Sequence, residues 1–296
     1  METLVPLISG ARTGPIGIAH LPRFWLKMRA HSVGLLTEGY RHGNGGSDEN
    51  LITTFGIDPD AFANFIAEKA PDYLSCEAWV RANAADASPE KIRSFTHQIV
   101  SFPMPDPRLS EWSTRFGLTD GTYVLAVELN ALDDWDLVHL QLRAPDAPST
   151  KLVPAISSGT AGPLGVLHLP RLWLKHRLNA VGRLPDGYRH GVGGFDELLT
   201  GKLGVDHVAF AAYVEADAPS YLEAEAWIRK HATMLTPPAI GDLNEQIRAT
   251  KMPAEMAAKR RGELGAGADG LELGIPLNDL DDWRLLHEQL KAVARV

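Results

Sequence analysis

Three basic side chains at helical spacing are the first candidates for chemistry in this sequence. His20, Arg23 and Lys27 stand three and four residues apart, so a helix carries all three on one side. The same residue types recur 148 positions later, as His168, Arg171 and Lys175. Arginine offers a planar fork of donors and lysine a point charge, which together suit a carboxylate or a phosphate. The stripe predicts an anion-binding face, and the alternative is structural ion pairing with acids such as Asp48 or Asp133.

A glycine-rich loop with the pattern YRHGxGGxDE is the second candidate. It spans residues 40–49 and recurs over residues 188–197. Its glycines permit positive φ and let a ligand approach the backbone, and the start of the helix expected next favours an anion. The alternative is a tight turn in which Asp48 caps that helix, although capping leaves the repeated Tyr, Arg and His unexplained. The pattern matches neither a dinucleotide fingerprint nor a P-loop.

We expect the stripe and the loop to form one site for general acid–base chemistry. His42 would move the proton, Asp48 would orient it and Tyr40 would act as a second acid. The expected catalytic residues are therefore His42, Asp48 and Tyr40, with His190, Asp196 and Tyr188 in the second copy. The expected substrate-binding residues are His20, Arg23, Lys27 and Arg41, with His168, Arg171, Lys175 and Arg189. Their cations would hold the anion and stabilise developing negative charge.

These residues favour isomerase or lyase chemistry on a small anionic metabolite, with no cofactor, over hydride or phosphoryl transfer. One alternative is a non-catalytic module that binds an anion or another protein. A third interpretation is purely structural, because the repeated charges can form a buried ion network that specifies the fold.

A third motif joins two aspartates, a tryptophan and a histidine. Its residues are Asp133, Asp134, Trp135 and His139, and again Asp281, Asp282, Trp283 and His287. Neighbouring carboxylates at a helix start typically serve caps and the helix dipole, and tryptophan typically serves the core. We therefore expect a structural role for this motif.

Two other kinds of site are disfavoured by the sequence. The repeated histidines and acids show no HExxH or CxxC spacing, and the arginines beside them would oppose a cation, so we expect no metal. A Ser-His-Asp hydrolase lacks its GxSxG turn, and Ser47 is replaced by Phe195 in the second copy.

The motifs lie in two copies of one sequence pattern, which we call the first and second repeats. Residues 4–142 align with residues 152–290 without a gap, and roughly 60 of the 139 aligned positions are identical. Strand signals are few, whereas helix signals recur. We therefore predict an all-α protein made of two homologous helical domains in tandem, 1–145 and 151–296. A short linker over 143–150 would join them, and they would pack as a pseudo-two-fold dimer.

Capping residues and prolines indicate where the helices begin. Pro22 and Pro170 suit the first turn of a helix that would run to about residue 36 or 184. The other predicted starts are near Asp48 and Asp196, at Asp58-Pro59, at Asp72 and Ser220, and at Ser88-Pro89 and Thr236-Pro237. Trp25, Trp79, Trp173 and Trp227 are expected in the core.

The composition and charge of the chain limit the kinds of partner that it is expected to bind. The 296 residues carry a net charge of −8, which argues against a nucleic-acid partner. No apolar run is long enough to span a membrane, and the N-terminus lacks the pattern of a signal peptide. The single cysteine, Cys76, has Ala224 as its counterpart and fits a reducing cytoplasm. We expect a cytoplasmic protein that binds a small anionic metabolite and has no nucleic-acid or membrane partner. The sequence is compatible with a homo-oligomer.

Each repeat also resembles bacterial domains of unknown function, family 5069. The resemblance rests on Leu21, Pro22, Arg23, Lys27, Arg29, Asp48, Gly56 and Asp58, and on Leu169, Pro170, Arg171, Lys175, Arg177, Asp196, Gly204 and Asp206. It implies a small helical domain and no particular activity. The chain departs from the family pattern in its tandem form, in the RHGxGG loop, and in Leu26 and Leu174, where an acidic residue is expected before the lysine.

Overall fold

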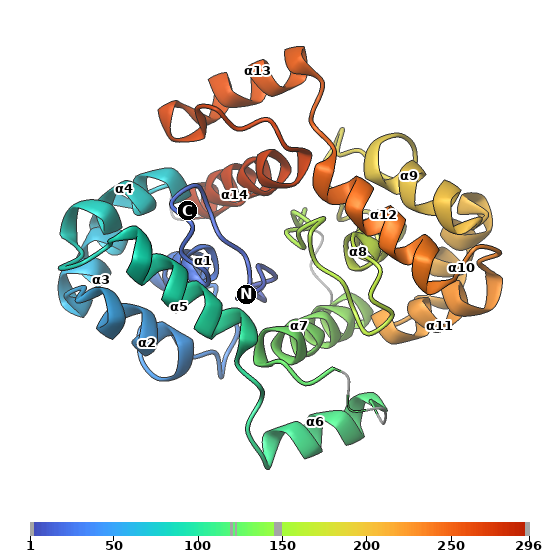
Figure 1. Ribbon diagram of the computed structural model, residues 1–296, viewed down its shortest axis with the longest axis horizontal. Helices are drawn as coiled ribbons and strands as arrows, with labels where there is room; N and C mark the ends of the chain where they lie inside the picture. The colour runs from blue at the N-terminus through green and yellow to red at the C-terminus, as the bar shows by residue number, and fades with distance from the viewer. Residues whose placement is uncertain (1–2, 119–120, 122, 145–149, 294–296) are drawn as a thin grey trace. The chain divides into compact units, whose positions relative to one another are not determined.

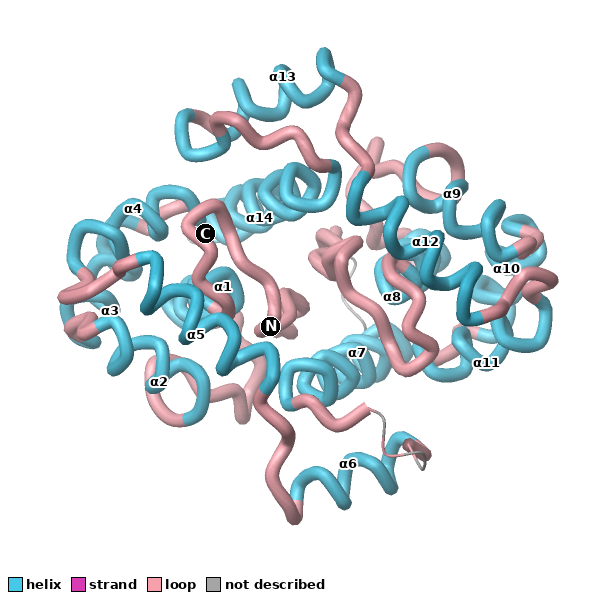
Figure 2. The backbone as a smooth tube through the Cα atoms, viewed as in Figure 1, coloured by secondary structure: helices cyan, strands magenta, loops and turns pink. Residues whose placement is uncertain are grey.

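The computed structural model describes residues 3–118, 121, 123–144 and 150–293. Over these residues the chain forms α-helices α1 to α14 and one short 3-10 helix, η1, and its strand-type pairing is confined to isolated bridges (Figures 1 and 2). The prediction of an all-α protein is confirmed. Residues 145–149 of the expected linker lie outside the described residues.

The chain divides into two compact units that do not follow the two repeats. Unit 1 consists of Met1–Ala131, Arg261–Asp269 and Leu280–Val296, and unit 2 consists of Leu132–Arg260 and Gly270–Asp279. Each repeat therefore contributes the end of its last long helix to the unit that holds most of the other repeat. The domains expected at 1–145 and 151–296, and their two-fold packing, stay predictions.

Unit 1 is built around α1 (Leu21–Ser32), which packs against α3 and α4. Its other helices are α2 (Gly46–Phe55), α3 (Pro59–Lys69), α4 (Tyr73–Asn83), α5 (Pro89–Ser101) and α6 (Arg108–Phe116), with the beginning of α7 (Ala126–Arg143), η1 (Ala266–Ala268) and the end of α14 (Gly274–Val293). All residues of α1 from Leu21 to Ala30 are buried, although three of them are cationic. Buried cations need partners, so α1 requires acceptors from its neighbours.

Unit 2 repeats this arrangement around α8 (Leu169–Ala180), which packs against α10 and α11. The remaining helices are α9 (Gly194–Leu203), α10 (His207–Asp217), α11 (Tyr221–His231) and α12 (Pro237–Ala249), with most of α13 (Ala254–Leu264), the end of α7 and the beginning of α14. α9 packs against α12, as α2 packs against α5 in unit 1.

The end of α14 places a tryptophan in the core of unit 1, and the end of α7 places one in the core of unit 2. In unit 1, Trp283 meets Tyr73 edge-to-face at 4.5 Å between ring centroids, and Tyr73 also meets Trp25. In unit 2, Trp135 meets Tyr221 in the same way at 4.6 Å. The core role expected for the tryptophans is confirmed for Trp25, Trp135, Trp173 and Trp283, which are buried. Trp79 and Trp227 are only half-buried.

Most of the predicted helix starts are present, and two details differ. Side-chain caps are made by Asp58, Asp72, Ser220 and Thr236. α1 ends at Ser32 rather than near residue 36, because Gly34 takes a φ of +70° and turns the chain away. The aspartates of the LDDW motif lie inside α7 and α14 rather than at a helix start, so the capping role expected for them is wrong.

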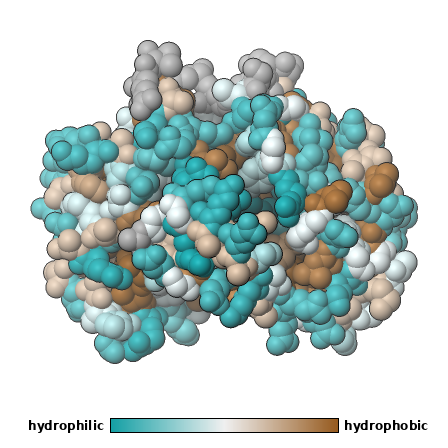
Figure 3. Space-filling model, turned by 90° about the horizontal axis from the view of Figure 1, so that it is seen from above, coloured by the Kyte–Doolittle hydropathy of each residue, from teal (hydrophilic) through white to brown (hydrophobic). Residues whose placement is uncertain are grey.

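The surface seen in Figure 3 is covered mainly by hydrophilic and intermediate residues, with hydrophobic residues between them. Among the described residues, no helix combines the length and the apolar character needed to cross a bilayer.

Candidate functional site

His20 stands immediately before α1 in an unusual backbone conformation. Its φ of 70° lies in the left-handed region, which a residue with a large side chain rarely adopts. His168 before α8 has a φ of 71°. Both histidines are buried, at 5% and 2% exposure. Such conformations persist only where the surroundings fix them, and they gather at functional sites.

Asp48 is the acceptor that fixes His20. Its Oδ1 lies 2.6 Å from Nε2 of His20, and Nζ of Lys27 lies 2.6 Å from both carboxylate oxygens. The backbone N–H of Gly43 donates to Oδ2 at 3.2 Å. The loop and the first turn of α2 thus place one carboxylate between a histidine and a lysine of α1. Lys27 and Asp48 confirm the alternative of an internal ion pair.

The second repeat builds the same network with the corresponding residues. Nε2 of His168 lies 2.6 Å from Asp196, and Nζ of Lys175 lies 2.5 Å from each oxygen of that carboxylate. Gly191 N–H donates to Asp196 at 2.6 Å. Asp48 and Asp196 are each 1% exposed, so both carboxylates are shielded from water.

Burial and charge set the protonation of these groups. Burial lowers the pKa of His20, and it lowers the pKa of His168 to about 4, in both cases against the opposing effect of the aspartate. Burial alone would raise the pKa of Asp48, but the hydrogen bond and charge of His20 and the charge of Lys27 outweigh it and hold the pKa low. At neutral pH the aspartate is therefore ionised and the histidine is neutral. A neutral histidine beside an ionised carboxylate donates Nε2–H, which leaves Nδ1 as the acceptor.

The arginine of the stripe is held by backbone carbonyls and a tyrosine ring. Nη1 of Arg23 donates to the carbonyls of Pro6 and Ile8, and the guanidinium carbon lies 5.9 Å from the Tyr40 ring centroid. In the second repeat Arg171 makes the corresponding contacts, and its Nη2 also donates to the Tyr188 hydroxyl at 2.5 Å. Arg23 and Tyr40 therefore lie together, as the grouping of stripe and loop predicts.

The structure places His42 apart from the carboxylate. The His42 ring stacks on His31 at 3.6 Å, and its Nδ1 lies 3.4 Å from the Tyr40 carbonyl. The expected orientation of His42 by Asp48 is wrong, because the stripe's own His20 takes that position. His190 likewise meets His176 rather than Asp196, with ring centroids 6.0 Å apart. Sequence distance misled here, since Asp48 is six residues from His42 and 28 from His20.

The remaining loop cation lies at the surface. Arg41 is exposed, and its guanidinium lies over Gly45, where a side chain would approach it to 3.1 Å. The N–H of Gly45 donates to Glu49 at 3.1 Å. The loop's backbone donors at Gly43 and Gly45 are thus satisfied by its own Asp48 and Glu49, and the Arg41 side chain stays exposed. Arg189 is exposed in the same way.

The two networks differ at the second nitrogen of the histidine. Ser158 Oγ lies 2.9 Å from Nδ1 of His168, so a serine closes the chain Ser158, His168 and Asp196. The residue aligned with Ser158 is Gly10, and a Cβ placed there would lie 3.1 Å from Nδ1 of His20. Nδ1 of His20 has no hydrogen-bond partner among the described residues. Sequence reasoning missed this pair, although a Gly-to-Ser difference inside the otherwise similar LVPxISx segment was visible.

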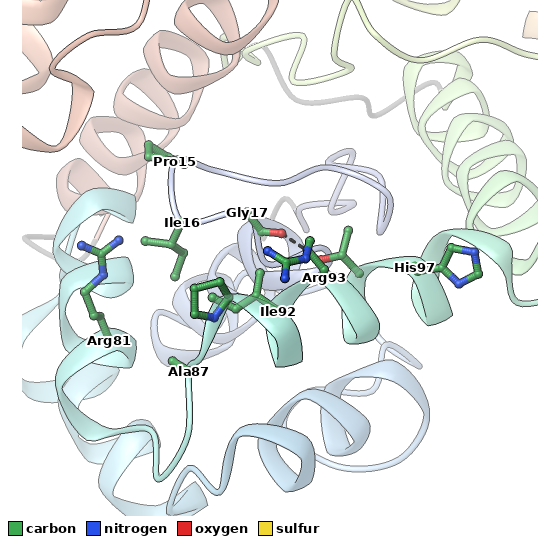
Figure 4. A pocket seen from close by; sticks show the side chains of 10 residues that line it. Pro15, Ile16, Gly17, Arg81, Ala87, Ile92, Arg93 and His97 are labelled. Carbon is green, nitrogen blue, oxygen red and sulfur yellow. Dashed lines mark hydrogen bonds between the residues drawn. The ribbon is translucent and has the colours of Figure 1, made fainter.

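A surface groove of about 760 Å³ lies beside the chain segment that leads to His20. It runs between residues 15–17, α4 and α5. Figure 4 shows Arg81 near one end and His97 near the other, with Arg93 between them. Thr96 connects the groove to the site, because its hydroxyl donates to the Gly17 carbonyl and accepts from Ala19 N–H, next to His20. In the second repeat, Gly241 and Glu245 replace Arg93 and His97.

The comparison with protein families agrees with the sequence pattern of the site. Residues 11–117 match the family model "Domain of unknown function (DUF5069)". The match contains His20, Arg23, Lys27, Asp48 and the whole glycine loop, so the network lies within the part that is similar to this family. No curated protein matches the chain.

Proposed function

We propose that this protein is a cofactor-independent enzyme that performs acid–base chemistry on a small anionic metabolite, with His20 as the base. Asp48 and Lys27 position His20, and Nδ1 accepts a proton from an acidic C–H of the substrate. The imidazolium then returns the proton to that carbon or to a neighbouring atom, which gives an isomerase. Alternatively it protonates a leaving group as the bond from that group to the adjacent carbon breaks and a double bond forms, which gives a lyase. The observation that carries the proposal is a neutral, carboxylate-oriented histidine whose Nδ1 has no partner among the described residues.

The backbone at His20 supports this role. A left-handed conformation costs about 1–3 kcal/mol at a non-glycine residue. Both His20 and His168 adopt this left-handed conformation. The contacts that hold each imidazole in place therefore offset the conformational cost. Asp48 also matches the partner that a catalytic histidine needs, because a buried carboxylate fixes the tautomer and stabilises the imidazolium that forms.

We assign the binding of the anionic group to Arg41. Lys27 and Arg23 have protein acceptors at 2.6 and 3.1 Å, whereas Arg41 is an exposed guanidinium on the same loop. A guanidinium binds carboxylate or phosphate with two parallel hydrogen bonds. Tyr40 would act as the second acid beside Arg23.

Exchange of substrate protons with deuterated water tests the proposal without knowledge of the product. A base that removes a C–H proton exchanges it with solvent, so proton NMR of the intact chain with small carboxylates and phosphate esters in D₂O reports the reaction directly. We expect the C–H proton signal of one compound class to disappear as deuterium replaces the proton, and we expect this exchange to be at least 100-fold slower in His20→Gln. Arg41→Gln is expected to raise KM more than it lowers kcat.

The second repeat supplies a matched control. Gly10→Ser introduces the hydroxyl that already sits on the histidine in the second repeat, so it is expected to fold and to suppress exchange. Ser158→Gly is expected to leave exchange by the first repeat intact. Exchange that survives Gly10→Ser and His20→Gln unchanged would overturn the assignment of His20.

A purely structural network is the second candidate. His20, Arg23, Lys27 and Asp48 are all 8% exposed or less, and the corresponding residues of the second repeat are similarly buried. Such a network would specify the fold and would predict no exchange with any compound class. The loss of unfolding free energy in Asp48→Asn measures how much the network contributes to stability.

We also propose that the two repeats are copies of one DUF5069-like domain in a cytoplasmic bacterial protein. The same hydrogen bonds at the same offset in both networks support the common origin of the two repeats. The expected pseudo-two-fold packing and a homo-oligomeric state belong to the same proposal, and scattering in solution tests both.

A further inference from the structure

A second set of buried cations lies at the ends of α1 and α8, away from the aspartate networks. Arg177, in the last turn of α8, is 1% exposed, yet its Nε and Nη2 have no hydrogen-bond partner among the described residues. Arg29, the corresponding residue of α1, is also 1% exposed, and the described part of the chain offers no partner to the same two atoms. Buried donors without acceptors are rare and destabilising. Their recurrence at the same atoms in both units points to a shared cause.

The two unpaired atoms form one edge of the guanidinium. Nε and Nη2 lie side by side in its plane, and this is an edge that binds two oxygens of a carboxylate or phosphate with parallel hydrogen bonds. In unit 1 the other terminal nitrogen, Nη1 of Arg29, already donates to Ser32 Oγ at 3.2 Å. The ordinary partner of a buried guanidinium is an anion, and no residue that the structure describes supplies one to either edge.

The neighbouring groups add positive charge and one further unpaired atom. In unit 2, Arg177 interacts with Arg143 and His139, both from α7, and Nδ1 of His139 is buried with no hydrogen-bond partner in the described ranges. In unit 1, His287 interacts with Arg29 and Lys291, and its buried Nδ1 likewise has no partner there. The acids that act on these histidines are Asp136 and Glu223 in unit 2, and Asp72 and Glu288 in unit 1. None of these acids bonds the free edge of either arginine.

We propose that each unit binds an oxyanion between the arginine that ends its central helix and the histidine of the helix it shares with the other repeat. Two adjacent oxygens of a carboxylate or phosphate accept from Nε and Nη2 of Arg177, and a third contact comes from Nδ1 of His139. The corresponding site in unit 1 uses Arg29 and His287. Arg143 and Lys291 occupy aligned positions and add a cation at each site.

The electrostatics of the arginines agree with this assignment. Burial lowers the pKa of Arg177, and the neighbouring charge of Arg143 lowers it further. An anion at the free edge would oppose both effects by favouring the charged guanidinium. These sites are distinct from the proposed catalytic base, because Arg29 lies nine residues beyond His20 and bonds neither Asp48 nor His20.

Titration of the intact chain with inorganic phosphate, and separately with acetate, tests the inference. The protein is first dialysed into a buffer without oxyanions, and binding is followed by calorimetry and by ¹H–¹⁵N spectra of arginine Nε. We expect saturable binding with shifts of the two buried Nε–H signals. Saturation by phosphate alone or by acetate alone identifies the class of oxyanion, and both results support the site.

Arg177→Lys and Arg29→Lys are the test variants, because lysine keeps the charge and loses the parallel donors. Arg177→Lys is expected to weaken binding at the unit 2 site at least tenfold, and Arg29→Lys to do the same at the unit 1 site. The double variant is expected to remove saturable binding. Arg248→Lys, at an exposed position, is the matched control and is expected to bind like the original chain. Absence of saturable binding by either ion, or binding unchanged in the double variant, would overturn the inference.

Discussion

Replacement of Asp48 by asparagine measures how much the network contributes to stability. The substitution keeps the shape of the side chain and an acceptor for Gly43 N–H, but it removes the charge opposite Lys27. Nζ of Lys27 has carboxylate oxygens at 2.6 Å and only 8% of its side chain exposed. Leaving one buried partner of an ion pair uncompensated costs about 3–5 kcal/mol. We therefore expect unit 1 to lose about this much free energy of unfolding.

The second unit serves as an internal control for this measurement. Hydrogen exchange followed by mass spectrometry reports α1 and α8 separately in one sample. A loss of about 3–5 kcal/mol accelerates exchange in α1 peptides by about 100-fold to several thousand-fold, whereas α8 peptides are expected to change little. Asp196→Asn should give the opposite pattern.

A double variant separates charge from shape. Lys27→Met removes the cation that Asp48→Asn leaves unpaired, so the double variant is expected to be about 1–3 kcal/mol more stable than the sum of the single effects. A loss below about 1 kcal/mol in Asp48→Asn, with no coupling to Lys27→Met, would refute the assignment of Asp48 as the buried counter-ion.

Three further predictions concern single side chains. Burial lowers the pKa of His176 to about 4, so the histidine of the unfolded chain is protonated at a higher pH than that of the folded chain, and stability falls as the pH drops below about 6.5. In His176→Met, which introduces the residue found at the aligned position Met28, urea unfolding at pH 5 should show a recovery of about 2 kcal/mol. Burial raises the pKa of Glu77 to about 7, so the stability that its protonated form contributes is complete at low pH and is lost as the pH rises from about 4.5 through 7. Glu77→Gln should remove this fall in unfolding free energy with rising pH. A pH profile of stability that is unchanged in the variant would contradict the raised pKa of Glu77. Gly14→Ala would place a Cβ 2.1 Å from Glu77 and 2.3 Å from the Tyr73 hydroxyl, so we expect a lower melting temperature and a loss of about 1–3 kcal/mol.

Local signals allowed the helices to be predicted well. Asp58 and Asp72 cap their helices because a short acidic side chain before a helix satisfies its first N–H groups. Such signals need only a few neighbouring residues. The end of α1 was predicted too late because Val33 and Leu35 continue an apolar pattern beyond Gly34, where the backbone has already turned.

The site was predicted in composition but not in pairing. His20, Lys27 and Asp48 were all candidates, yet Asp48 was paired with His42, its close neighbour in the sequence. The loop carries Asp48 back to α1, and only the fold determines which histidine it meets. The exchange of helix ends between the units was also hidden, because an alignment of repeats does not say which core a terminal helix joins.

The difference between the two repeats at the histidine Nδ1 bears most directly on function. Both repeats keep the histidine, the lysine and the carboxylate with nearly equal distances. The network therefore has a role that is common to both units. The fold does not require a hydroxyl at Nδ1, because Ser158 provides one in unit 2 and Gly10 provides none in unit 1. A nitrogen bonded to an internal hydroxyl is occupied, whereas the same nitrogen next to a glycine is available to a ligand. The Gly10→Ser substitution therefore changes a contact at the histidine Nδ1 that the two repeats do not share. Its effect on proton exchange separates chemistry at His20 from a purely structural network.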